Sequence, residues 1–223
     1  MPTENPELTV EAVTDRIGGI GVLPVIVIDD LAQARPLARA LVDSGLHTAE
    51  VTFRTPQALE ALSVFAGHPE LLVGAGTVRT AEQVRRARDA GARFVVSPGF
   101  SEPVVEACRA LEVPVFPGVS SATDIHRATE ASLAVLKFFP AEASGGPAAI
   151  AALAAPFPDV RFIPTGGVGP RNLADYVSLS AVCCVGGSWM VPRDAMRAGD
   201  WRRVTELCRN AVAQIAHLRS RGS

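Results

Sequence analysis

The sequence predicts an α/β fold, specifically a (β/α)8 TIM barrel with one extra N-terminal helix. Short apolar runs rich in Val, Ile and Phe alternate with amphipathic stretches of about ten residues, which is typical of repeated βαβ units. Eight such runs in 223 residues leave about 28 residues per repeat, which suits a barrel with short loops. The rival fold is an open doubly wound sheet, which usually has a GxGxxG turn after its first strand. That turn is absent here.

The expected strands are the apolar runs themselves. They cover residues 21–28, 48–53, 71–77, 94–98, 113–118, 134–139, 161–166 and 182–187. The extra helix is expected at residues 7–17, and further helices follow the strands, for example over 31–44, 80–90 and 102–112. Thr80 is the expected N-cap of the helix over 80–90, and Gly91 is expected to end it.

No linker or shift in composition divides the chain, so residues 1–218 are expected to form one domain. Residues 219–223, with the sequence RSRGS, are interpreted as a tail or an expression scar and are left out of the predicted fold.

The composition excludes several classes of function. A net charge of −2 and a pI near 6.1 provide no cationic field for nucleic acid or for an anionic membrane. There is no signal-peptide pattern and no run of eighteen apolar residues, so a cytoplasmic protein is expected. The four cysteines show no CxxC spacing and no nearby His at zinc-ligand spacing, so they are expected to be buried thiols, with no metal bound.

The basic residues are twenty arginines and a single lysine, Lys137. A GC-rich genome explains the arginines, but it does not explain why one lysine remains. Arginine never loses its proton in proteins, whereas lysine can. Burial in the apolar run AVLKFFP disfavours the ammonium form, so Lys137 could supply a neutral amine that attacks a carbonyl group. The alternative is a structural lysine at a strand end, paired with a carboxylate.

Barrel enzymes collect their functional groups at the carboxyl ends of the strands. The second predicted strand offers Glu50 and Arg54, four residues apart and therefore on one strand face, and the third ends at Thr77. Glu50 near Lys137 could transfer protons, and Arg54 has the fork that suits a substrate carboxylate. The alternative for Glu50 is a structural ion pair with Arg54.

Two glycine loops, PTGGV at 164–168 and VGGSW at 185–189, end the last two predicted strands. Barrels often bind phosphate there through backbone N–H groups, so the loops, with Ser188, predict a phosphorylated small-molecule substrate. Ordinary barrel turns are the alternative. A third segment, VGAGTV at 73–78, is interpreted as providing room at the barrel mouth.

Taken together, these strand ends resemble a known family, the bacterial 2-keto-3-deoxy-6-phosphogluconate (KDPG) aldolases, also called 4-hydroxy-2-oxoglutarate aldolases. The likeness extends from about residue 12 to residue 210. The motifs that carry it are EVTFRT (50–55), GAGTV (74–78), SPG (97–99), PGV (117–119), KFFPAE (137–142), PTGGV (164–168) and GGSW (186–189).

The resemblance implies a class I aldolase of the Entner–Doudoroff pathway, a homotrimeric barrel that produces pyruvate and glyceraldehyde 3-phosphate without a metal or cofactor. It implies that Lys137 forms the Schiff base and that Glu50 is the general acid and base. Arg54 and Thr77 match groups that hold the pyruvate carboxylate, and Pro98 and Phe139 match pocket residues. The residues that match the phosphate end are Thr165, Gly166, Gly167, Gly187 and Ser188.

The chain departs from the family pattern at Phe53, where Leu is common, and at the pair Cys183 and Cys184. Other functions remain open from the sequence. One is an aldolase for the galactonate epimer or for unphosphorylated 4-hydroxy-2-oxoglutarate. Others are a phosphate-binding barrel isomerase, in which Lys137 would be structural, and a sugar-phosphate sensor without activity.

Overall fold

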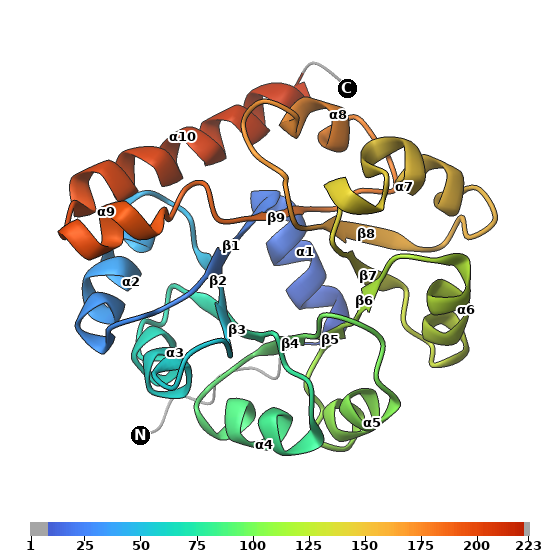
Figure 1. Ribbon diagram of the computed structural model, residues 1–223, viewed down its shortest axis with the longest axis horizontal. Helices are drawn as coiled ribbons and strands as arrows, with labels where there is room; N and C mark the ends of the chain where they lie inside the picture. Colours follow the sequence, from blue (N-terminus) through green and yellow to red (C-terminus); the bar gives the residue numbers. More distant parts are fainter. Residues whose placement is uncertain (1–8, 221–223) are drawn as a thin grey trace.

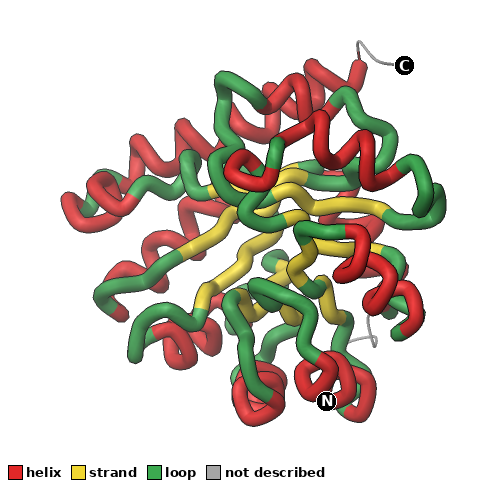
Figure 2. The backbone as a smooth tube through the Cα atoms, turned by 45° about the vertical axis from the view of Figure 1, so that its right-hand side comes forward, coloured by secondary structure: helices red, strands yellow, loops and turns green. Residues whose placement is uncertain are grey.

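The computed structural model describes residues 9–220, with parallel strands at the centre and most helices outside them (Figures 1 and 2). The strands are β1 (Val22–Ile26), β2 (Thr48–Thr52), β3 (Leu72–Gly76), β4 (Phe94–Val96), β5 (Val115–Phe116), β6 (Gly118–Val119), β7 (Val135–Phe138), β8 (Arg161–Pro164) and β9 (Val185–Gly187).

One helix precedes the first strand, and the others follow strands along the chain. They are α1 (Val10–Ile20), α2 (Ala34–Asp43), α3 (Ala58–Ala66), α4 (Ala81–Asp89), α5 (Glu102–Ala110), α6 (Ala122–Glu130), α7 (Gly146–Ala154), α8 (Leu173–Val177), α9 (Arg193–Ala198) and α10 (Trp201–Ser220), with short 3-10 turns η1 (Leu31–Gln33) and η2 (Glu142–Ser144). Thr80 caps α4 by accepting a hydrogen bond from the Gln83 amide, as predicted.

The strands form two parallel sheets, one in the order β5-β4-β3-β2-β1-β9 and the other in the order β6-β7-β8. The predicted α/β fold with parallel strands is confirmed, and each of the eight expected runs contains strand. The fifth run is divided into β5 and β6 at Pro117. Proline has no N–H to donate to a ladder, although the Pro117 carbonyl still accepts from the Lys137 amide at 2.9 Å.

The two sheets are separated at Pro117, between β5 and β6, and they meet again between β8 and β9. There, isolated bridges join Phe162 to Val182 and Thr165 to Gly186. The strands therefore do not form one continuous closed ladder of hydrogen bonds. The structure shows an α/β fold with two parallel sheets, and it does not show the closed barrel that the sequence predicts. Pro164 at the end of β8 also lacks an N–H, so a regular ladder is interrupted there as it is at Pro117.

Helix α1 packs against apolar side chains that both sheets turn toward each other. Its Val13 and Ile17 join a buried cluster with residues of β1, β3, β4, β5 and β8. Figure 1 shows α1 across the middle of the strands. Helix α1 runs three residues beyond the predicted end at residue 17, because Gly21, with φ of 79°, supplies the left-handed C-cap. Predicted residues 7 and 8 lie outside the described part.

Helix α10 corrects the predicted domain boundary at residue 218, because it continues to Ser220. Arg219, assigned from the sequence to a tail, donates hydrogen bonds to the carbonyls of Gly18 at 2.6 Å and Cys183 at 3.0 Å. It therefore ties the end of α10 to α1 and to the segment before β9. Residues 221–223 lie outside the described part. Within residues 9–220, no helix has the length and apolar character needed to cross a membrane.

Candidate active site

A buried ion pair lies between the two sheets. Lys137 on β7 and Glu50 on β2 approach to 3.1 Å between Nζ and Oε1, and their side chains are 4% and 1% exposed. The two residues are each centred in a strand, where the register pairs Glu50 with Val25 and Gly74. Because β2 and β7 belong to different sheets, this contact places both sheets around one shared interior. Buried charges at such positions require partners, and each residue supplies the other's.

The ring of Phe139 lies near the same amine, with its centroid 5.3 Å from Lys137 Nζ. The spacing of two predicts a shared strand face for Lys137 and Phe139, but β7 ends at Phe138 and Phe139 lies in the turn that follows. A cation above an aromatic face is favourable, and the ring is half-buried. Phe139 therefore lines the space above Lys137.

Arg54 and Thr77 meet at the ends of neighbouring strands. Arg54 Nε donates to Thr77 Oγ1 at 3.3 Å. The sequence placed Arg54 on the same strand face as Glu50, but β2 ends at Thr52, and Arg54 is exposed in the turn that follows. Glu50 pairs with Lys137, so among the described residues the alternative Glu50–Arg54 ion pair is wrong.

Thr77 adopts a backbone conformation that is rare for its type. Its φ is 57°, in the left-handed region, which β-branched residues seldom occupy. Strained residues of this kind persist where the surrounding structure holds them, often at functional sites. Here the strain turns the chain after β3 and brings the Thr77 hydroxyl to Arg54.

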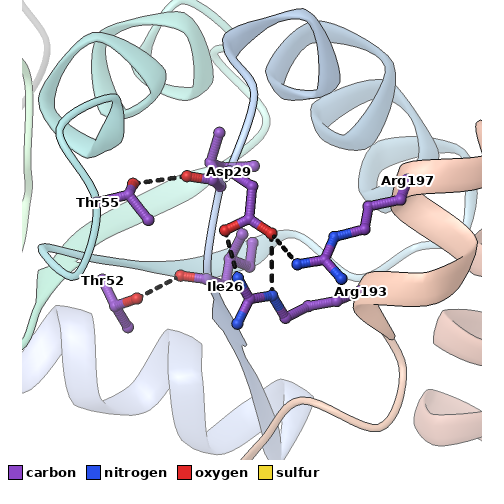
Figure 3. A network of polar contacts seen from close by, with 7 residues as sticks. Ile26, Asp29, Thr52, Thr55, Arg193 and Arg197 are labelled. Carbon is purple, nitrogen blue, oxygen red and sulfur yellow. Dashed lines mark hydrogen bonds and ion pairs between the residues drawn. The ribbon is translucent and has the colours of Figure 1, made fainter.

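The ends of β1 and β2 are joined by side-chain hydrogen bonds, which Figure 3 shows. The hydroxyls of Thr52 and Thr55 donate to the carbonyls of Ile26 and Ile28 at 2.7 and 2.6 Å. These bonds hold the chain on both sides of Arg54 against β1, so they fix the turn that carries the guanidinium group.

An ion-pair cluster holds α9 to the end of β1 (Figure 3). Asp29 accepts hydrogen bonds from both Arg193 and Arg197. The hydrogen bond from Arg193 is the main cause that lowers the pKa of Asp29. Because α9 follows the loop after β9, the cluster fixes one side of that loop.

The two glycine loops lie side by side, since Thr165 pairs with Gly186 in an isolated bridge. Gly166 and Gly167 have φ of 101° and 85°, which only glycine adopts readily, so the loop needs both. Thr165 is 5% exposed, while Ser188 is exposed beyond the end of β9 and Gly187 is buried at that end.

The loop after β8 is supported by the segment that follows Lys137, a feature absent from the predicted site. The amides of Ala141 and Glu142 donate to the carbonyls of Thr165 and Gly166 at 2.8 and 3.0 Å. The Glu142 carboxylate accepts a hydrogen bond from the buried hydroxyl of Tyr176. Glu142 belongs to the KFFPAE motif, and Tyr176 is the only tyrosine of the chain. These two features of the sequence could have pointed to the pair.

Pro98 follows β4 and is half-buried. A Cβ atom on Gly118 of β6 would lie 2.2 Å from the Pro98 carbonyl oxygen, so these segments pack with no space for a side chain between them. This contact connects the ends of the two sheets near the Lys137 strand, because Gly118 pairs with Lys137.

A cavity of about 510 Å³ lies elsewhere. Its lining includes Arg16, Arg88 and Arg93, and no predicted site residue is among the described residues that line it. Within residues 9–220, no group of three His, Cys, Asp or Glu side chains is arranged to hold a metal ion. The four cysteines are free and buried, as predicted.

The family assignment follows from comparison with known sequences. A profile of the family described as KDPG and KHG aldolase matches residues 13–207. This chain belongs to that family. A KHG/KDPG aldolase of Escherichia coli (strain K12) is 47% identical over 192 residues, which cover 86% of this chain and 90% of the relative.

Solved structures of family members have the same fold. The KDPG aldolase of Legionella pneumophila, with pyruvate captured as a covalent carbinolamine intermediate, matches with a TM-score of 0.87 and 42% identity over 91% of this chain and 98% of that one. The KDPG aldolase of Zymomonas mobilis ZM4 with 3-phosphoglycerate matches with a TM-score of 0.85 and 40% identity over 93% of this chain and 96% of that one.

Proposed function

We propose that this family member is a class I aldolase, a carbon–carbon lyase that cleaves KDPG to pyruvate and glyceraldehyde 3-phosphate. The observation that carries the proposal is the buried pair of Lys137 and Glu50, an amine and a carboxylate 3.1 Å apart. The carbinolamine of the Legionella relative supports it, since that species forms when an amine attacks the ketone of pyruvate.

In the first step Lys137 passes its proton to Glu50, and the neutral amine attacks the C2 ketone. Glu50 returns that proton to the carbinolamine hydroxyl group, which leaves as water and gives an iminium ion. Arg54 and Thr77 hold the C1 carboxylate through the guanidinium fork and the hydroxyl that already contact each other. Holding the carboxylate fixes the ketone beside Nζ, which replaces a collision in solution by a reaction between oriented groups. Pro98 and Phe139 line this part of the pocket.

In the second step the Glu50 carboxylate accepts the proton of the C4 hydroxyl group. The C3–C4 bond then breaks, its electrons pass into the iminium to form an enamine, and the aldehyde leaves. Protonation of the enamine at C3 and hydrolysis release pyruvate and regenerate the amine. Glu50 is already at hydrogen-bonding distance from Nζ, so it can serve both proton transfers without a large movement.

The phosphate of the substrate is placed at the loops that follow β8 and β9. Thr165, Gly166, Gly167, Gly187 and Ser188 provide hydroxyl groups and close approach of the backbone there. We also expect cleavage of unphosphorylated 4-hydroxy-2-oxoglutarate, which presents the same keto acid to Lys137. The names of the relatives favour the gluconate over the galactonate epimer.

We also propose that the chain is a single domain whose two sheets close into a (β/α)8 barrel. The bridges between β8 and β9 support this proposal. A homotrimer in the cytoplasm, active without a metal or cofactor, completes the proposal and rests on the family resemblance. Size-exclusion chromatography with light scattering tests the trimer.

The mechanism is tested by incubating the protein with pyruvate, reducing it with borohydride and measuring its mass. The wild-type chain should gain one reduced pyruvate on the peptide that contains Lys137, its only lysine. An isomerase or a sensor would gain none.

Two variants serve as controls. Lys137→Arg should abolish both the adduct and turnover while the fold is kept. Arg85→Lys adds an exposed surface amine, and it should remain unlabelled while Lys137 reacts. Labelling of both amines to the same extent would show that the reaction does not depend on the site.

A further inference from the structure

We propose that Gly76 is a positioning residue: the absence of a side chain there creates the space that the Glu50 carboxylate occupies and so holds Glu50 against Lys137. The catalytic consequence rests on the proposed aldolase mechanism. The spatial claim rests only on the geometry of β2 and β3.

Gly76 ends β3 and pairs with Thr52 of β2. A Cβ atom added to it would lie 2.2 Å from Glu50 Oε1, 2.5 Å from Cγ and 2.7 Å from Cδ. Real Cβ atoms do not approach other atoms this closely. Gly76 does not adopt a positive φ, so the backbone conformation does not require glycine there. The remaining reason for a glycine at position 76 is the space that the Glu50 side chain occupies.

Glu50 cannot easily move aside to admit a methyl group. Its side chain is 1% exposed, and the added atom would meet both the stem and the carboxylate. The hydrogen bond to Lys137 is 3.1 Å long, so a displacement of about 1 Å takes it beyond bonding distance. Gly76→Ala should therefore separate the carboxylate from the amine and from the substrate proton.

Gly74 provides a matched control in the same strand. It lies two residues earlier, on the same face of β3, and its added Cβ would lie 2.2 Å from the ring of Phe94. Gly74→Ala therefore introduces a comparable steric conflict, but with a core ring in place of the carboxylate. A difference between the two variants reports on Glu50 and not on overpacking of β3.

The activity test compares wild type, Gly76→Ala and Gly74→Ala, with rates normalised to the folded fraction measured by circular dichroism. Gly76→Ala should lower kcat about 100-fold, as expected for a displaced catalytic group. It should still trap pyruvate with borohydride, because Lys137 keeps its place in β7. It should also slow the exchange of pyruvate methyl protons in D2O, which requires proton transfer at the enamine. Gly74→Ala should keep kcat within threefold. Equal losses in both variants would overturn the proposal.

The spatial claim has a separate test that does not need activity. We combine each alanine variant with Glu50→Ala and measure the urea midpoint of unfolding. Gly76→Ala should lower the midpoint in the Glu50 protein and much less in the Glu50→Ala protein, while the effect of Gly74→Ala should be the same in both.

This second test also covers a variant that does not fold. If Gly76→Ala folds only when Glu50 is truncated, the proposal is supported; if it fails in both backgrounds, the proposal is overturned. A wild-type protein that forms no pyruvate adduct would refute the aldolase mechanism, and the midpoints would still decide whether Gly76 makes room for Glu50.

Discussion

Removing the amine of the buried ion pair should cost more stability than removing the whole pair. Lys137→Met leaves the Glu50 carboxylate, 1% exposed, without its 3.1 Å partner. Breaking a buried pair on one side typically costs about 3–5 kcal/mol, whereas replacing both partners by apolar residues of similar size is often neutral or stabilising. Lys137→Met/Glu50→Leu should therefore recover most of the loss.

The magnitude is large enough to measure directly. For a chain of this size, about 3–5 kcal/mol corresponds to a fall in Tm of about 6–20 °C. Urea unfolding at pH 7, followed by circular dichroism at one fixed protein concentration, gives the free energies of unfolding of wild type, Lys137→Met, Glu50→Leu and the double variant.

Two results would refute the reasoning. One is a Lys137→Met variant that loses less than about 1 kcal/mol; the other is a double variant no more stable than Lys137→Met. If the reasoning holds, the pair is kept for its chemistry and not for stability.

Three further predictions concern other parts of the structure. Burial raises the pKa of the Cys108 and Cys208 thiols from 9.0 to about 12. As the pH rises, the unfolded chain therefore loses these protons before the folded chain does. The free energy of unfolding should fall between pH 9 and pH 12, by about 1.4 kcal/mol per pH unit for each thiol. Urea midpoints should show this fall in wild type, and an equally steep fall in Cys108→Ala/Cys208→Ala would contradict it. Thr77→Gly removes both the strain at φ of 57° and the hydroxyl that contacts Arg54; it should raise the KM for the keto acid several-fold without lowering the urea midpoint, and an unchanged KM would remove Thr77 from carboxylate binding. Tyr176→Phe removes the hydroxyl that supports the loop after β8 and should cost about 1 kcal/mol; KM should rise for phosphorylated substrate and not for 4-hydroxy-2-oxoglutarate, whereas equal rises would point to a general structural effect.

The order of strands and helices could be predicted from the sequence because it depends on local patterns. Alternating apolar runs and amphipathic stretches located every strand, and Thr80 marked the start of α4. The errors lie where a single residue changes the local geometry. Pro117 divides the fifth strand, Gly21 extends α1, and the turn after Thr52 takes Arg54 off the strand face predicted for it.

The sequence by itself determined which residues have unusual chemistry. A single lysine in an apolar run, a glutamate within a strand and glycines at strand ends stand out by type and position alone. Their contacts were decided only by the tertiary structure. Lys137 and Glu50 are 87 residues apart and meet because two sheets enclose one interior. Gly76 matters only because its missing Cβ leaves the place where Glu50 lies. Periodicity is a local property of the chain, whereas register and close packing between sheets depend on all strands at once.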